Sequence, residues 1–140
     1  MANIKRQRRT VLTEENLKKF LSIETLKLNL DHHNWLKDSF LAKIGGLAPN
    51  LKDLCLRRLP ISNASFTELV HKLHHLEKLD ISDCSLIEES GMKELFKNNG
   101  QSLKFLNASN CIDAVTDETL SALCAIEEPV LEHLDISYCK

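Results

Sequence analysis

Leu76-Glu-Lys-Leu79-Asp-Ile81-Ser-Asp-Cys84 is a phrase that recurs along the whole chain. It returns as Leu103-Lys-Phe-Leu106-Asn-Ala108-Ser-Asn-Cys111 and as Leu131-Glu-His-Leu134-Asp-Ile136-Ser-Tyr-Cys139. Residues 51–59 and residues 23–31 are looser copies. Counted between first apolar positions, the copies follow one another after 28, 25, 27 and 28 residues. A near-constant period of this size indicates a protein assembled from stacked structural repeats.

Each copy predicts a short strand, and the residues after it predict a helix. In Leu-x-x-Leu-x-Ile, strand alternation turns the apolar side chains inward and the residues between them outward. After the copy at residues 51–59, helical spacing recurs in Phe66, Leu69, Val70 and Leu73. Strands joined by helices pair in parallel, and each repeat buries its apolar face against its neighbours. The sequence therefore predicts an α/β solenoid, a short horseshoe with the parallel β-sheet on its concave face and helices on its convex face.

Local signals set the expected element boundaries. We expect Thr13 to cap a first helix, because its hydroxyl can accept a hydrogen bond from a free N–H there. The first strand is expected to turn Leu26 and Leu28 inward, and Gly45-Gly46 to end the helix that follows. Cys124 is expected to face the core from the last helix.

Composition places the chain among soluble globular domains. Its 140 residues are 43% hydrophobic and 27% charged, and its net charge of −2 gives no overall attraction to nucleic acid or membrane. No apolar run approaches the roughly 20 residues of a membrane span. We expect a basic tail over residues 1–12 and a repeat domain over residues 13–140. That domain would hold an N-terminal half-repeat helix and about five strand units, the last of them incomplete.

The tail concentrates basic residues and holds no acidic one. Its cations are Lys5, Arg6, Arg8 and Arg9. Such a cluster is typical of a nuclear import signal, a mitochondrial presequence, a nucleic-acid contact or simply a solvated terminus. The sequence leaves these alternatives open.

The repeated phrase resembles the leucine-rich repeat in its cysteine-containing subtype. The matching residues are Leu76-x-x-Leu79-x-Ile81-x-x-Cys84, followed by Ile87-x-x-x-Gly91-Met92-x-x-Leu95. This subtype is known from F-box/leucine-rich-repeat proteins and from related ciliary and mitotic-exit proteins. The resemblance covers residues 13–140 and implies the solenoid fold. The first two copies depart from the pattern, with Asp31 and Leu59 at the cysteine position. The stretch before Thr13 is too short for an F-box, so we expect no ligase activity from this polypeptide by itself.

The cysteines favour a structural role in a reducing compartment. They number five, and Cys84, Cys111 and Cys139 fall at the repeat period, which is not a disulfide framework. Strand neighbours lie roughly 4.7–4.9 Å apart along a ladder, so these thiols would not converge on one zinc ion. We expect each thiol to pack under the turn after its strand and to donate to a backbone carbonyl. Cys55 is expected on the outward side. The chain is accordingly expected inside the cell, in the cytoplasm first, with nucleus, cilium and mitochondrion open.

No motif in the sequence predicts an enzyme, a cofactor or a metal site. The chain has no glycine-rich phosphate loop, no nucleophile elbow and no Cys-x-x-Cys pair. His71, His74 and His75 are the one candidate metal cluster, but no acid or cysteine at a suitable spacing completes it, which favours solvated histidines. Asp80 and Asp135 would stand two strand spacings apart on an open surface, which is unsuited to acid–base catalysis.

The outward strand residues are the candidate binding surface. Alternation also turns Thr25 outward, and Phe105 stands out as an aromatic in a polar row. Phe105 is either a hot spot for a partner or packed against its neighbours on the same face. The predicted partner-binding residues are Lys27, Asp53, Arg57, Lys78, Asp80, Phe105, Asn107, His133 and Asp135.

These observations predict a non-catalytic protein–protein interaction scaffold with an unidentified protein partner. It would use the concave face and the open C-terminal edge, since the last strand ends beside Cys139 with an unpaired edge. We expect it to be part of a larger protein or assembly, without membrane contact and with nucleic acid only as a possibility for the tail. The alternatives are the substrate-recognition module of an F-box-type ubiquitin ligase and a structural subunit of a ciliary or mitochondrial complex.

Overall fold

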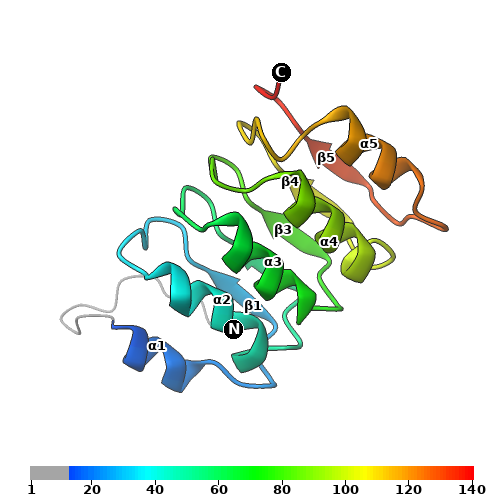
Figure 1. The fold of residues 1–140 in the computed structure, drawn as a ribbon. Helices are drawn as coiled ribbons and strands as arrows, with labels where there is room; N and C mark the ends of the chain where they lie inside the picture. Colours follow the sequence, from blue (N-terminus) through cyan, green and yellow to red (C-terminus); the bar gives the residue numbers. More distant parts are fainter. Residues whose placement is uncertain (1–12) are drawn as a thin grey trace.

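Each copy of the phrase supplies one strand of a single parallel sheet. The computed structural model describes residues 13–140, and in this part of the chain the sheet has the strand order β1-β2-β3-β4-β5. Successive copies therefore stack as neighbours in chain order (Figure 1). The strands are β1 (Lys27–Asn29), β2 (Asp53–Cys55), β3 (Lys78–Asp80), β4 (Phe105–Asn107) and β5 (His133–Asp135).

Helices cover one face of this sheet and leave the other free. They lie side by side in Figure 1, in the order of the chain. Thr13 caps the first of them as expected, since its hydroxyl accepts a hydrogen bond from the N–H of Asn16 at 3.1 Å. We call the uncovered side of the sheet the helix-free face. The helices are α1 (Glu14–Phe20), α2 (Asp38–Leu47), α3 (Asn63–His71), α4 (Glu89–Asn99) and α5 (Asp117–Cys124).

The first copy pairs two residues further along than expected. Leu28, not Leu26, is the register partner of Leu54. Leu26 is 46% exposed, whereas Leu30 is fully buried. Thr25 takes the first position of the phrase, so the expectation that it faces outward is wrong. It is buried, and its hydroxyl donates to the carbonyl of Phe20 at 3.4 Å.

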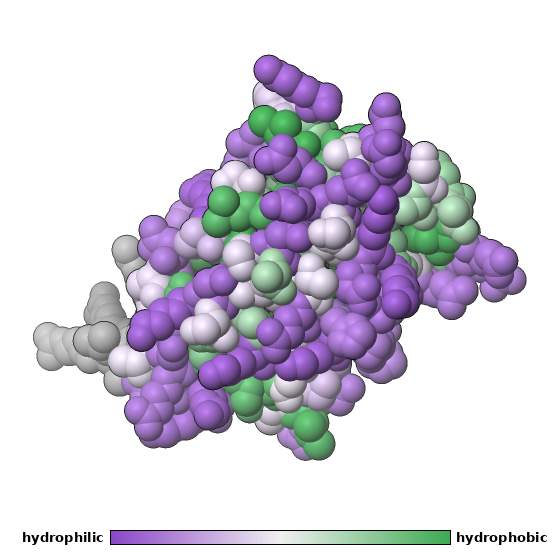
Figure 2. Space-filling view, in the orientation of Figure 1, coloured by the Kyte–Doolittle hydropathy of each residue, from purple (hydrophilic) through white to green (hydrophobic). Residues whose placement is uncertain are grey.

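Burial is complete in the inner copies and incomplete in the last. The central leucine of the phrase is at most 2% exposed in the first four copies, but Leu134 in the fifth is 37% exposed. Leu120, Leu123 and Leu131 around it are only partly buried. Figure 2 shows the corresponding apolar area beside α5. The C-terminal side of the sheet therefore presents core-type residues at the surface. Cys124, expected in the core, is exposed on α5.

A ladder of hydrogen bonds joins the starts of successive helices. The first residue of one helix accepts a hydrogen bond from the N-cap residue of the next helix. The contact gives that N-cap residue a partner that its own helix does not provide. The four contacts are Glu14 Oε1 with Lys37 N (2.8 Å), Asp38 Oδ1 with Ser62 N (2.7 Å), Asn63 Oδ1 with Glu88 N (3.0 Å) and Glu89 Oε2 with Thr116 Oγ1 (2.8 Å).

Gly45 and Gly46 lie inside α2, so the expectation that they end this helix is wrong. Gly45 is buried against α3, where an added Cβ would stand 2.7 Å from the carbonyl oxygen of Leu69. At Gly46 an added Cβ would make only ordinary van der Waals contact, with the Lys72 side chain at 3.9 Å. The first glycine therefore allows two helices to approach closely, and the second has no such role.

Every copy closes on a residue with left-handed backbone geometry. These residues have φ angles between 55° and 67°, a region in which most side chains are strained. They are His32, Arg58, Asp83, Asn110 and Tyr138. The chain turns there from the strand toward the next helix.

In residues 13–140, no helix is long and apolar enough to cross a membrane.

Candidate partner-binding surface

Two rows of side chains cover the helix-free face. The strand register fixes both rows, because each residue stands beside its equivalent on the neighbouring strand. Row one is Lys27, Asp53, Lys78, Phe105 and His133, and row two is Asn29, Cys55, Asp80, Asn107 and Asp135. None of these ten residues is buried, so all predicted strand residues lie at the surface where alternation placed them.

Row two mainly builds turns. Its Asn and Asp side chains accept a hydrogen bond from the N–H two residues later, which bends the chain out of the strand. The contacts involve Asn29 with Asp31 (2.9 Å), Asp80 with Ser82 (2.9 Å), Asn107 with Ser109 (3.0 Å) and Asp135 with Ser137 (2.9 Å). The hydrogen bonds from Ser137 also lower the pKa of Asp135. Sequence reasoning missed this role, although the recurring Asx-x-Ser spelling signals it.

The turn contacts leave part of each carboxylate unused. In Asp80 and Asp135 the oxygen Oδ1 accepts the hydrogen bond, and within residues 13–140 Oδ2 has no hydrogen-bond partner. Both side chains remain partly exposed. They can therefore offer a negative charge to a partner while the turn stays intact.

Row one differs from copy to copy and contains the aromatic pair. The rings of Phe105 and His133 stack in parallel, with centroids 4.6 Å apart and planes 4° apart. Stacking stabilises such a pair beyond its burial, by about 0.5–1.5 kcal/mol. Phe105 nevertheless stays half-exposed. It packs against its neighbour on the same face and still presents apolar surface.

The two lysines of row one are free of ion pairs. Lys27 and Lys78 are exposed, and neither has an acidic partner within 4.0 Å in residues 13–140. By contrast, Glu77 at the foot of β3 lies 3.8 Å from Lys52 and 3.7 Å from Lys104. The charged residues beside the strands therefore pair with one another, whereas the two lysines of row one are available to a partner.

Arg57 follows the last residue of β2 by two positions and lies outside row two. Its Nε is buried without a hydrogen-bond partner in the described chain, as is Oδ1 of Asp31 on the neighbouring copy. The next residue, Arg58, lies 4.0 Å from Asp83. Of the nine residues predicted from sequence, Arg57 is the one that stands apart from the two rows.

The cysteines form a ladder on the covered side. Cys84 donates its thiol hydrogen to the Leu56 carbonyl at 3.0 Å, Cys111 to Ile81 at 3.0 Å, and Cys139 to Ala108 at 3.3 Å. Burial raises the pKa of Cys84 to about 12 and that of Cys111 to about 11. The expected structural role of these thiols is confirmed. Cys55 lies half-exposed on the helix-free face, as expected, and burial raises its pKa.

The three histidines near the end of α3 have different surroundings. His71 Nδ1 lies 2.7 Å from Glu94 Oε1, and this contact lowers the pKa of Glu94. His74 and His75 are exposed beyond the end of α3. Within residues 13–140, no group of three or more His, Cys, Asp or Glu is placed to hold a metal ion.

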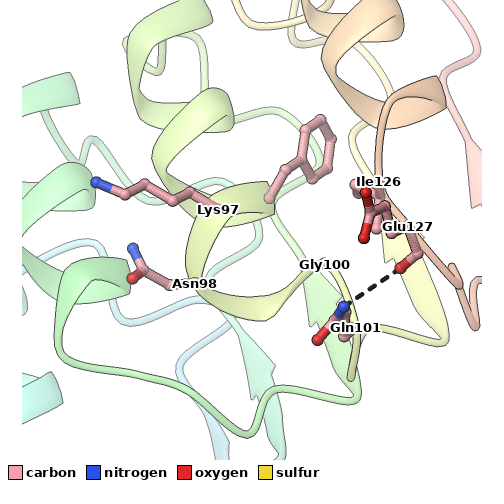
Figure 3. A pocket seen from close by; sticks show the side chains of 7 residues that line it. Lys97, Asn98, Gly100, Gln101, Ile126 and Glu127 are labelled. Carbon is pink, nitrogen blue, oxygen red and sulfur yellow. Dashed lines mark hydrogen bonds between the residues drawn. The ribbon is translucent and has the colours of Figure 1, made fainter.

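Two hollows of the described part of the chain lie on the helix side, away from both rows. One of about 390 Å³ lies between the end of α4 and the segment after α5, where Gln101 Nε2 donates to the Glu127 carbonyl at 3.3 Å (Figure 3). Lys97 and Asn98 point away from Ile126 in this view. Another of about 550 Å³ lies between α1 and α2.

Comparison with known proteins supports the fold. No protein-family profile matches the chain. Among solved structures, it is similar to a chain of the yeast Rad7–Elc1 complex, with a TM-score of 0.64 and 24% identity over 74% of this chain and 27% of that one. It is similar to the tropomodulin C-terminal domain of Caenorhabditis elegans, with a TM-score of 0.67 and 18% identity over 91% and 82%. Leiomodin-1 actin-binding site 2 matches with a TM-score of 0.67 and 14% identity over 88% and 76%.

These similarities concern architecture alone. At identities below 25% they show that stacked strand–helix units of this kind occur in other proteins. The chain spans about a quarter of the Rad7–Elc1 chain that it matches and most of the other two domains. Function has to be argued from the surface of this molecule.

Proposed function

We propose that the chain is a non-catalytic protein-interaction scaffold, a leucine-rich-repeat solenoid whose helix-free face is the concave binding surface. The observation that carries this proposal is the half-exposed stacked pair Phe105–His133 beside the unpaired Lys78. An exposed aromatic in an otherwise polar row stabilises no core, whereas partner-facing aromatics dominate the energy of many interfaces. On the covered face, by contrast, the central leucines of the first four copies are buried by packing.

The C-terminal side is a second candidate surface. Val130, Leu134 and Tyr138 are 39%, 37% and 83% exposed there, beside the partly buried residues of α5. Clustered apolar exposure of this kind is typical of a surface that binds protein. We propose that this edge contributes to assembly, and that the free, unpaired cysteines suit a reducing, cytoplasmic setting.

Affinity capture with matched variants tests the main surface. The tagged chain and its Phe105→Ser and Leu86→Ser variants would be expressed in cells and their bound proteins quantified by mass spectrometry. Leu86 is 51% exposed but lies outside the two rows, so it controls for loss of any surface apolar group. We expect a reproducible partner to be reduced at least about tenfold by Phe105→Ser and retained by Leu86→Ser. A partner that ignores Phe105 would contradict the proposal.

One observation bears on the ubiquitin-ligase alternative. A structurally similar chain was solved as part of the Rad7–Elc1 complex, so this architecture occurs in a complex with another protein. We propose adaptor binding as the distinguishing property: a ligase module should co-purify with an adaptor at a fixed ratio. Absence of an adaptor from the native complex would contradict this alternative. Imaging of the tagged chain would likewise test the ciliary or mitochondrial alternative.

A further inference from the structure

Charge is distributed unevenly along the helix-free face. The two N-terminal strands and their flanking turns carry more basic than acidic side chains, and the three C-terminal ones carry the reverse. The N-terminal set is Lys27, Lys52, Arg57 and Arg58 against Asp31 and Asp53. The C-terminal set is Lys78 and Lys104 against Glu77, Asp80, Asp83, Glu132 and Asp135. The aromatic pair therefore stands in the acidic half.

Within that half, two carboxylates flank the strand that carries Phe105. The register pairs Asn107 with Asp80 on one side and with Asp135 on the other. Two strand spacings separate the carboxylates, roughly 9–10 Å. Each keeps Oδ2 free, as described above, and neither forms an ion pair within 4.0 Å in residues 13–140.

We infer that this half of the face binds a segment of a partner protein through an arginine side chain. The arginine would lie across Asn107, with its guanidinium between Asp80 and Asp135 and its apolar stem against the ring of Phe105. The inference rests on the proposed function and specifies the chemistry of the partner at that site.

The geometry favours arginine over lysine. A guanidinium is planar, and its N–H donors lie in that plane and point outward from different edges, so one group can reach two carboxylates on opposite sides of it. An ammonium group is a compact point charge and can contact only one of them closely. The stem of either residue can cover apolar surface, so the discrimination comes from the head group.

The molecule itself provides the variant that tests this inference. Row two already holds asparagine at two positions, Asn29 and Asn107, and both make the same turn contact as the aspartates. Asp80→Asn with Asp135→Asn therefore removes the charges and keeps the turns. Asp113→Asn is the matched control, because it removes an exposed carboxylate that belongs to neither row.

The experiment is a selection of random 12-residue displayed peptides on the full 140-residue chain, followed by affinity measurement of enriched synthetic peptides. We expect the enriched peptides to have an arginine in common. Changing that arginine to lysine should weaken binding about fivefold or more, and the double Asn variant should weaken it about tenfold or more. Asp113→Asn should change it less than about threefold.

The possible failures are distinguishable. The inference would be overturned, and the proposed function left standing, by peptides whose binding requires Phe105 but no arginine. Peptides that bind the double Asn variant unchanged would have the same consequence. If no enriched peptide loses affinity on Phe105→Ser, the proposed use of this face is contradicted as well. Circular dichroism and thermal unfolding of each variant would verify that the fold is retained.

Discussion

The two faces of the sheet follow different rules. On the covered face, the same residue types recur in every copy, and the central leucines of β1 to β4 are at most 2% exposed. On the helix-free face, row one changes from Lys27 to Asp53, Lys78, Phe105 and His133. The packing of one copy against the next determines the residue types of the covered face, because each copy must fill the space left by its neighbour. It places no such demand on row one, which is therefore where function can vary.

The strongest test of this contrast compares two leucines at the same place in the phrase. Leu79 is fully buried and Leu134 is 37% exposed. We expect Leu79→Ala to lower the free energy of unfolding by about 3 kcal/mol, through lost burial and a new cavity. Leu134→Ala should cost about 1 kcal/mol or less. Urea unfolding of both variants measures this, and equal losses would show that the last copy is as tightly packed as the inner ones.

A second test uses the adjacent glycines of α2. Gly45→Ala forces a Cβ to within 2.7 Å of the Leu69 carbonyl oxygen, so we expect a loss of about 1–3 kcal/mol despite the better helix propensity of alanine. At Gly46 the new Cβ makes only ordinary van der Waals contact with the Lys72 side chain, so Gly46→Ala should gain about 0.5–1 kcal/mol. Thermal unfolding should show shifts of opposite sign. Shifts of the same sign would contradict the close packing of α2 on α3.

The ladder of helix starts predicts a dependence on acid. Burial alone would raise the pKa of Asp38, but hydrogen bonds from Ser62 and Ser65 outweigh it, and the pKa lies below its ordinary value. A pKa depressed in the folded state adds stability above the unfolded value, about pH 4, and that stability is lost as the pH falls through the folded value.

Asp38→Ala should therefore cost about 1–2 kcal/mol at pH 7 and less below about pH 4. Its neighbour Ser39 is exposed, so Ser39→Ala is the control and should change little. Urea midpoints measured from pH 2.5 to pH 7 would show the effect. A cost for Asp38→Ala that is the same across this range would contradict the ladder.

The smallest effect on stability is expected on the helix-free face. Phe105→Ser removes a half-exposed ring and its stacking on His133, and we expect a loss of at most about 1–1.5 kcal/mol. A loss near that of Leu79→Ala would mean that Phe105 belongs to the scaffold. Differential scanning calorimetry of the two variants side by side would decide between these roles.

The strand register was predictable wherever the phrase is complete. Leu54, Leu79, Leu106 and Leu134 pair as expected because apolar residues at fixed spacing can be buried in only one way. The first copy was misplaced because residues 26, 28 and 30 are all leucine, and a shift by two residues keeps the strand residues Lys27, Leu28 and Asn29 on their expected faces. Only contacts with the next copy select the correct register.

Features that depend on a neighbouring element were not predictable. Gly45 reads as a helix end in sequence, but its role comes from the backbone of α3. The stacking of Phe105 on His133 likewise requires the register of β4 and β5. Alternation did place the nine proposed binding residues at the surface. It did not reveal that Asp80 and Asp135 also hold turns, because the signal for that role is the recurring Asx-x-Ser spelling and not the strand alternation.

Site-specific photo-crosslinking tests the central claim most directly. A p-benzoylphenylalanine residue would replace Lys78 on the helix-free face or Lys97 on the helix side, both of which are exposed. In cells, the claim predicts a discrete crosslinked protein from position 78, lost on Phe105→Ser, and none of that mass from position 97. The same crosslinked protein from position 97 with none from position 78 would contradict the assignment of binding to the helix-free face.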